Sequence, residues 1–290
     1  MGENLLAQNL FSLKGKVALV TGGGTGLGKS ISKAFVKNGA KVYIASRKQK
    51  NLEEAAAELN SLGGPGKCIP ITADITIKEE CEKIANKISE KENGKLDILI
   101  NNSGTSWPTP LKEVPEKVWD KVYRLNVISV YYMTIACLPL LEKASNAPEN
   151  PSKVIIMGSI AGIIEGDFRS LDKMKMNRTT MVYNTSKAAA HSLARNLAVY
   201  LTPCGVNVNV IAPGIIPSRM NLSVLDRKLA MEEIPQGRLG NEEDISGAAL
   251  YLASRAGAWV TGTTIRIDGG TLLYGKDVGR EYAIANKSKL

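Results

Sequence analysis

The segment YNTSK contains the two side chains best suited to proton transfer, Tyr183 and Lys187. Residues four apart on a helix share one face, and the surrounding sequence MVYNTSKAAAHSLARNLAVYL indicates a helix. A phenol with a pKa of about 10 is a poor acid–base group at neutral pH, and a nearby ammonium ion favours its ionised form. The pair is therefore a tunable proton donor and acceptor. Because this spacing is common by chance, it needs support from the rest of the chain.

A glycine-rich loop, TGGGTGLG at 21–28, joins an apolar run at 16–22 to a helical segment at 27–40. The loop does not match G-x-G-x-x-G in any frame. Glycines at such a position still let the backbone turn tightly and approach a pyrophosphate at the N-terminus of the following helix. A plain strand-to-helix turn is the alternative interpretation.

Two cations, Arg47 and Lys48, follow Ser46 at the end of the next apolar run, KVYIAS. An NAD-binding sheet usually places a carboxylate here for the ribose 2′-hydroxyl, whereas arginine matches the geometry of a phosphate. The pattern predicts a pocket for the 2′-phosphate and hence NADP(H) as the cofactor. A solvated helix start is the alternative.

Short apolar runs alternate with longer helical segments along the 290-residue chain. The predicted strands lie at 16–22, 41–46, 67–74, 96–102, 153–159, 206–214 and 260–270. The predicted helices lie at 27–40, 51–64, 77–94, 115–143 and from 181 onward. This alternation predicts an α/β fold, a single-domain doubly wound Rossmann parallel sheet of about seven strands flanked by helices. We place the domain at 14–272, with an N-terminal extension at 1–13 and a tail at 273–290.

The bulk composition excludes several classes of function. The net charge of +9 is spread along the chain without a basic run, which favours a solvated surface over a nucleic-acid partner. The longest uncharged run, 125–141, is too short to span a bilayer. The single histidine, His191, and scattered cysteines disfavour a zinc site or any other metal site. We interpret His191 as a surface or packing residue, and we expect the four cysteines to be reduced.

Taken together, the motifs resemble those of the short-chain dehydrogenase/reductase family. They occur in the family's order: TGGGTGLG at 21–28, AD at 73–74, NNSG at 101–104, Asn126, Ser159, Tyr183-x-x-x-Lys187, APG at 212–214 and VTGTTIRIDGG at 260–270. The resemblance covers about 14–272. The segments NNSGTSW, NVNVIAPG, PSRM and IPQGRLG are most similar to NADPH-dependent β-ketoacyl reductases of the rhamnolipid-synthesis type.

The resemblance implies a catalytic role for four residues. Tyr183 would donate a proton to the substrate carbonyl, and Lys187 would hold the nicotinamide ribose and lower the pKa of Tyr183. Ser159 would bind the carbonyl oxygen together with Tyr183, and Asn126 would hold a water molecule of a proton relay. A strand-end cap is the alternative for Ser159.

The resemblance also implies a set of cofactor contacts. They are Thr21, Gly22, Gly24, Thr25, Gly26, Leu27, Gly28, Ser46, Arg47, Lys48, Asp74, Ile75, Asn102, Ser103, Gly104, Tyr183, Lys187, Pro213, Gly214 and Ile216. Asp74 and Asn102 equally fit plain turn positions. Ser103 stands where the family usually has alanine, and we expect the turn to tolerate it.

Ser159 and Tyr183 are further apart than in the family, and the excess is an insert near 165–180. Its ends are tied to two site residues, so we expect it to lie beside the pocket. Its basic side chains could meet an anionic substrate tail and its apolar ones an acyl chain: Arg169, Lys173, Lys175 and Arg178, and Phe168, Met174 and Met176. A solvated surface loop is the alternative.

The resulting hypothesis is an NADPH-dependent reductase of a ketone, with a 3-oxoacyl thioester as the favoured substrate. A polyol, sugar or xenobiotic carbonyl reductase is the alternative within enzymes, and an NADP(H)-binding sensor is the alternative outside them. A 2,4-dienoyl-CoA reductase is disfavoured because those relatives lack the tyrosine. The terminal Ser288-Lys289-Leu290 predicts recognition by the peroxisomal import receptor, with a cytoplasmic location as the alternative. Relatives are commonly homotetramers, so we expect a homotetramer or homodimer.

Overall fold

A computed structural model describes residues 5–145, 148–164, 179–218 and 226–273 of the chain. Its centre is one sheet of seven strands in the order β3-β2-β1-β4-β5-β6-β7, and all six pairings are parallel. The strands are β1 Val17–Thr21, β2 Lys41–Ser46, β3 Lys67–Thr72, β4 Ile98–Asn101, β5 Ser152–Met157, β6 Val206–Pro213 and β7 Thr264–Ile267. The predicted doubly wound sheet is confirmed.

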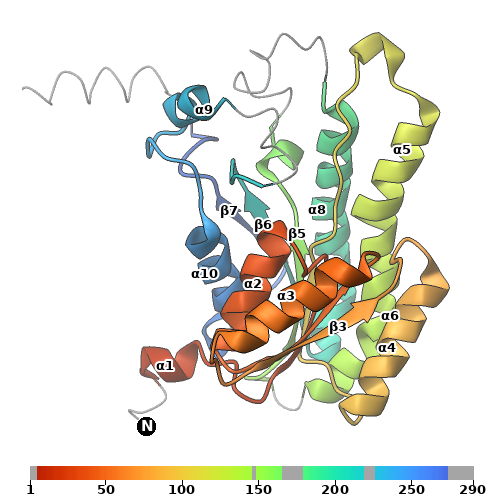
Figure 1. The fold of residues 1–290 in the computed structure, drawn as a ribbon, viewed down its shortest axis with the longest axis vertical. Helices are drawn as coiled ribbons and strands as arrows, with labels where there is room; N and C mark the ends of the chain where they lie inside the picture. Colours follow the sequence, from red (N-terminus) through yellow and green to blue (C-terminus); the bar gives the residue numbers. More distant parts are fainter. Residues whose placement is uncertain (1–4, 146–147, 165–178, 219–225, 274–290) are drawn as a thin grey trace, which may run out of the picture.

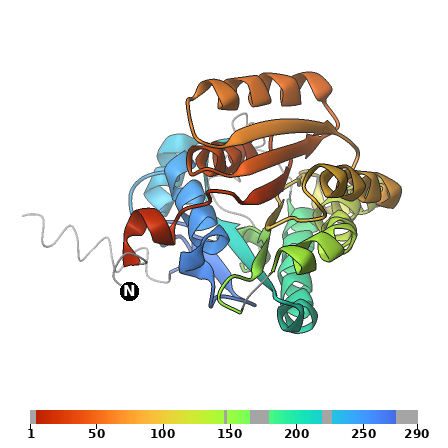
Figure 2. The same cartoon turned by 90° about the horizontal axis from the view of Figure 1, so that it is seen from below.

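Helices cover both faces of this sheet (Figures 1 and 2). One core cluster packs against α2 Gly26–Lys37, α3 Gln49–Ser61 and α10 Glu242–Ala253. The other packs against α4 Lys78–Lys91, α6 Ser129–Ala144 and α8 Met181–Leu201. The central strands are covered on both sides, so every residue of β4, β5 and β6 is buried. Three shorter α-helices are also described: α1 Ala7–Leu10, α5 Glu116–Tyr123 and α9 Arg227–Glu233.

The predicted helix at 115–143 differs from the structure in one respect. A wider π-helical turn, Arg124–Ile128, separates α5 from α6, and it places Asn126 at 1% exposure in the interior. Single π turns of this kind are often found at functional sites. Over Glu116–Ala144 the helical run is long and apolar enough to cross a membrane, by length and composition alone. In α6, however, Met133, Cys137 and Leu141 are fully buried in the core.

The order of the strands decides where a ligand can bind. The chain runs outward from β1 to β3 and then returns to place β4 on the other side of β1. The connections leaving β1 and β4 therefore diverge to opposite faces of the sheet. In open α/β sheets, ligands bind in the crevice at the carboxyl ends of the strands where the order reverses in this way.

Candidate active site

A cleft of about 500 Å³ lies at the carboxyl ends of the strands. It receives residues from the segments that follow β1, β2, β3, β4, β5 and β6, and from α8. The lining residues are Gly22, Gly24, Thr25, Gly26, Leu27, Ser46, Arg47, Lys48, Asn51, Ala73, Asp74, Ile75, Asn102, Ser103, Gly104, Leu125, Met157, Gly158, Ser159, Tyr183, Lys187, Pro213, Gly214, Ile216 and Ser218. Segments far apart in the sequence thus meet in one site.

The glycine loop forms one wall of the cleft because it packs without side chains. A Cβ atom on Gly28 would lie 2.4 Å from Asn102 Nδ2 and 2.5 Å from the Gly22 oxygen, so no larger residue fits. Gly22 has a φ of 67° and so adopts a left-handed conformation that suits glycine. The Thr21 hydroxyl accepts hydrogen bonds from the main-chain nitrogens of Asn102 and Ser103, at 3.0 and 3.1 Å. Thr21 and Gly28 therefore join the loop to β4 and do not line the cleft themselves.

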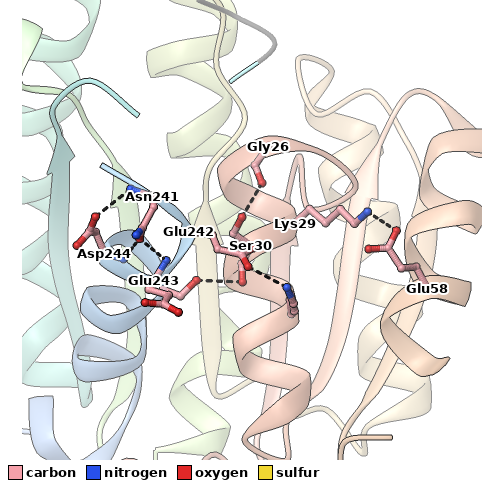
Figure 3. A network of polar contacts seen from close by, with 10 residues as sticks. Gly26, Lys29, Ser30, Glu58, Asn241, Glu242, Glu243 and Asp244 are labelled. Carbon is pink, nitrogen blue, oxygen red and sulfur yellow. Dashed lines mark hydrogen bonds and ion pairs between the residues drawn. The ribbon is translucent and has the colours of Figure 1, made fainter. Parts of the chain in front are cut away.

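The helix that follows this loop, α2, is held on both sides by neighbouring helices (Figure 3). Lys29 pairs with Glu58 of α3 at 2.5 Å, and Lys33 pairs with Glu242 of α10 at 2.9 Å. The Ser246 hydroxyl of α10 donates to the Ser30 oxygen at 3.1 Å. The N-terminus of α2, where Gly26 and Leu27 line the cleft, is thus fixed in place, and its free N–H groups favour an anion.

Two cations lie at the end of the cleft next to β2. Arg47 Nη1 is 3.8 Å from Asp74 Oδ2, and the Arg47 side chain is 67% exposed. Asp74 Oδ1 accepts from the nitrogen and hydroxyl of Thr76 at 3.0 and 2.7 Å, which fixes the carboxylate in a turn. An exposed ion pair at this distance is weak, so the Arg47 guanidinium can leave Asp74 and bind a phosphate instead. Together with Lys48, this donor set fits a 2′-phosphate.

The acid–base residues lie at the opposite end of the cleft, at the junction of β5 with α8. The Ser159 and Tyr183 side chains are hydrogen-bonded to each other, and Ser159 Oγ also accepts from the Ala161 nitrogen at 3.1 Å. Burial raises the pKa of Tyr183, and the hydrogen bond from Ser159 lowers it. The predicted one-turn spacing brings Lys187 beside the phenol, with Nζ 5.7 Å from the centre of the Tyr183 ring.

Lys187 is also tied to the end of β5. Its Nζ donates a hydrogen bond to the Met157 oxygen at 2.6 Å. Burial lowers the pKa of Lys187 to about 8. The ammonium ion is therefore easier to deprotonate than an exposed lysine.

Asn126 lies behind the cleft and does not line it. Its Oδ1 accepts from the Thr105 nitrogen at 2.9 Å, and its Nδ2 donates to the Thr105 oxygen at 3.0 Å and to Ser186 Oγ at 2.9 Å. Both polar atoms thus bind protein groups and connect the loop after β4 to α8. A Cβ atom on Gly104 would lie 3.4 Å from Asn126 Oδ1 and 3.5 Å from Lys187 Nζ, so the two side chains are neighbours across this glycine.

Comparison with known proteins agrees with this architecture. The model of short chain dehydrogenases matches residues 16–228. The chain belongs to the short-chain dehydrogenase family. The rhamnolipids biosynthesis 3-oxoacyl-[acyl-carrier-protein] reductase of Pseudomonas aeruginosa is 40% identical over 264 residues, which are 90% of this chain and 97% of that protein. The short-chain dehydrogenase/reductase PhomF of Diaporthe leptostromiformis is 35% identical, over 93% of this chain and 95% of its own.

A solved structure of this family is similar over the same range. The RhlG/NADP active-site complex of Pseudomonas aeruginosa has a TM-score of 0.81 and 39% identity, and the match covers 90% of this chain and 98% of that one. The predicted resemblance to short-chain dehydrogenases, and to the rhamnolipid-synthesis reductases among them, is confirmed.

Within this family framework, most of the predicted residues meet in the cleft. Of the predicted site residues, Thr21, Gly28 and Asn126 lie outside the lining, in the positions described above. Six lining residues were not predicted: Asn51, Ala73, Leu125, Met157, Gly158 and Ser218. Each is adjacent or close in sequence to a predicted residue, and Asn51, one turn after Lys48 on α3, could have been found by helical spacing.

The insert near 165–180 lies almost wholly outside the described residues, and so do the basic and apolar side chains proposed for it. Its last part is described: Thr179 forms an isolated antiparallel bridge with Thr109, with N–O distances of 2.7 and 3.2 Å. The end of the insert is therefore joined to the segment that follows the cleft residue Gly104.

His191 and the cysteines are also placed. The interpretation of His191 as a packing residue is confirmed and the surface alternative is wrong, because His191 is only 4% exposed. The four cysteines are free thiols, and Cys204 alone is exposed. Within the described residues, no group of three His, Cys, Asp or Glu side chains could hold a metal ion.

Proposed function

We propose that the protein reduces a ketone to a secondary alcohol with NADPH. The observation that carries the proposal is the hydrogen-bonded pair of Ser159 and Tyr183 in the same cleft as the glycine loop and the cations Arg47 and Lys48. One end of the cleft thus presents proton-donating groups, and the other presents groups that suit a phosphorylated nucleotide.

The residues present fit this cofactor. The Gly22–Gly28 contact leaves a surface without side chains for a pyrophosphate, and Arg47 and Lys48 supply charge for the 2′-phosphate. Gly214 and Ile216 line the cleft near the acid–base residues, where the nicotinamide end would lie. When bound, the nicotinamide supplies the hydride for the carbonyl carbon.

The protein's own groups act on the carbonyl oxygen. The Ser159 hydroxyl donates a hydrogen bond to that oxygen and stabilises its developing negative charge. Tyr183 donates its phenolic proton to the same oxygen, and the raised pKa keeps the phenol protonated at neutral pH. Lys187, with Nζ close to the Tyr183 ring, supplies positive charge that favours the phenolate left behind.

A 3-oxoacyl thioester is the substrate that we favour. The relative from Pseudomonas aeruginosa is by its name a 3-oxoacyl-[acyl-carrier-protein] reductase. Large apolar side chains are exposed close in sequence to cleft residues, namely Trp107, Ile163 and Ile164, and such side chains suit an acyl chain. Polyol, sugar and xenobiotic carbonyl compounds are the competing substrates.

The test is NADPH oxidation with the purified protein against a panel of acetoacetyl-CoA, longer 3-oxoacyl thioesters, diketones and keto sugars. We expect the highest kcat/KM with a 3-oxoacyl thioester. If only keto sugars or diketones were reduced, the proposed thioester substrate would be wrong, and the proposed ketone reduction would stand. Tight NADPH binding without turnover of any member would instead support a sensor module.

We propose that the protein is a homo-oligomer, a tetramer or dimer. Ile128, Tyr131 and Ile135 recur at helical spacing along one side of α6 and its preceding turn and are 37–46% exposed, and Trp259 is 95% exposed. Such apolar groups on a surface suit contacts between copies. Light scattering in solution tests this, with a monomer at micromolar concentration as the contrary result.

We propose a peroxisomal location, which rests on Ser288-Lys289-Leu290, outside the described residues. Deleting these three residues from a protein tagged at its N-terminus should move it to the cytosol. Unchanged import after the deletion would contradict the proposal.

A further inference from the structure

His191 lies directly behind the main chain of Ser159. It belongs to α8, one turn after Lys187, and its Nε2 is 3.4 Å from the Ser159 nitrogen, a long hydrogen bond in which the N–H donates. A Cβ atom on Gly158 would lie 2.1 Å from Nε2 and 2.7 Å from Cδ2. The imidazole therefore occupies the space that a side chain at position 158 would need. The ring packs directly against the main chain that follows β5.

The charge state of the ring agrees with this contact. An imidazole nitrogen accepts a hydrogen bond only when it carries no proton, so the ring is neutral with its proton on Nδ1. Burial lowers the pKa of His191 to about 4, and the positive charges of Lys187 and Arg195 act in the same direction. The acceptor is therefore present throughout the neutral range.

Ser159 is consequently held from three sides. Its N–H meets His191, and its Oγ accepts from the Ala161 nitrogen and is hydrogen-bonded to the Tyr183 phenol. The backbone there is extended, with φ −168° and ψ 152°, and the residue caps the short 3₁₀ turn Ile160–Gly162. With the main chain fixed, the direction of the hydroxyl depends on one side-chain torsion.

We propose that His191 is a positioning residue for the reduction, which holds the main chain of Ser159 so that its hydroxyl is aimed at the substrate carbonyl. The inference rests on the proposed function of Ser159. It assigns the chain's single histidine a part in the site without any contact to substrate or cofactor. A small displacement of a hydrogen-bond donor is enough to slow a reaction that depends on it.

Two substitutions distinguish the effect of the hydrogen-bond acceptor on His191 from the effect of the ring's volume. His191→Leu keeps the volume and removes the acceptor, whereas His191→Gln keeps an acceptor at similar reach. We expect His191→Leu to lower kcat by about tenfold, since an aligned donor is worth this or more, with the Kd for NADPH within about twofold. We expect His191→Gln to recover most of kcat. Thermal unfolding of both variants shows whether the fold is retained.

A double-mutant cycle with Ser159→Ala decides whether His191 acts through Ser159. We expect Ser159→Ala to lower kcat strongly and His191→Leu to add little in that background. An equal loss in both backgrounds, or no recovery with His191→Gln in a folded protein, would overturn the positioning role alone. Normal kcat for Ser159→Ala would instead contradict the proposed function of Ser159, and the inference with it.

Discussion

Lys187 Nζ lies 2.6 Å from the main-chain oxygen of Met157 at the end of β5. This hydrogen bond joins the helix of the acid–base residues to the strand that leads to Ser159. A charged ammonium ion makes the stronger bond, yet burial lowers its pKa to about 8. The charge is therefore present at neutral pH and lost under mildly alkaline conditions, which has a consequence for cofactor binding.

We expect the affinity for NADPH to fall as the pH rises above about 8, because Lys187 then loses the charge proposed to hold the ribose. Fluorescence titration of NADPH between pH 6.5 and 9.5 measures this. The matched controls are Lys187→Arg, which keeps its charge and should show no fall, and Lys187→Met, which should bind weakly throughout. A fall of equal size in Lys187→Met would exclude Lys187 as its source.

The contribution of Lys187 to folding stability should rise with pH, whereas its contribution to NADPH affinity should fall. The folded-state pKa is depressed from 10.5 to about 8, so the unfolded state binds more protons in this window. Stability therefore rises with pH between these values, relative to Lys187→Met. Urea unfolding of both proteins at pH 7.5 and 9.5 separates this effect from cofactor binding.

Tyr183→Phe should reduce kcat by at least about a hundredfold, since it removes the proton donor of the reaction. The Kd for NADPH should stay within about twofold, because Arg47, Lys48 and Lys187 all remain in the cleft. Tyr200→Phe is the matched control: Tyr200 lies on the same helix, is 74% exposed and should tolerate the change. Near-normal turnover by Tyr183→Phe would remove it from the mechanism.

Arg47→Ala should raise the KM for NADPH by about tenfold and leave that for NADH unchanged, because only NADPH carries the 2′-phosphate. Lys50→Ala is the control. Lys50 lies three residues after Arg47, in the first turn of α3; its side chain is 88% exposed, and it does not line the cleft. Steady-state kinetics with both cofactors measures the two effects. Equal weakening of NADH and NADPH by Arg47→Ala would contradict the assignment of the 2′-phosphate pocket.

His191 gives the chain a sensitivity to acid that should disappear on substitution. Its folded-state pKa is lowered from 6.5 to about 4, so the unfolded state binds more protons between these values and stability is lost as the pH falls through them. At pH 4.5 the loss relative to pH 7 is about 2 kcal/mol from this group. Chemical unfolding at both pH values should show a larger loss of unfolding free energy for the wild type than for His191→Gln. An equal loss in the two proteins would contradict the prediction.

The parts of the site that could be predicted are those whose function depends on local sequence. Tyr183 and Lys187 are one turn apart on one helix, and Arg47 and Lys48 follow a strand directly, so spacing alone places each pair. The orientation of Lys187 toward Met157 could not be predicted, because it depends on a strand that is remote in sequence.

Three other features of the structure do not follow from the motifs in the sequence. The π turn at Arg124–Ile128 interrupts a run of residues that is also suited to a continuous helix. The burial of His191 depends on Gly158 leaving room for the ring, and no local pattern records this. The sequence-based prediction does not include α10, although Asn241 and Asp244 form a capping box at its start, three residues apart.

Gly28→Ala should destabilise the protein and weaken NADPH binding, whereas Gly247→Ala should do neither. A Cβ at 28 would lie 2.4 Å from Asn102 Nδ2 and 2.5 Å from the Gly22 oxygen, so the glycine loop must move away from β4. Such overpacking costs about 1–3 kcal/mol. Gly247 lies inside α10 with nothing within 4 Å of its Cβ position, and alanine there should stabilise the helix by about 0.5–1 kcal/mol. Urea unfolding and NADPH titration of both variants test the pair, and a Gly28→Ala protein with wild-type stability and affinity would show that the loop does not need this contact.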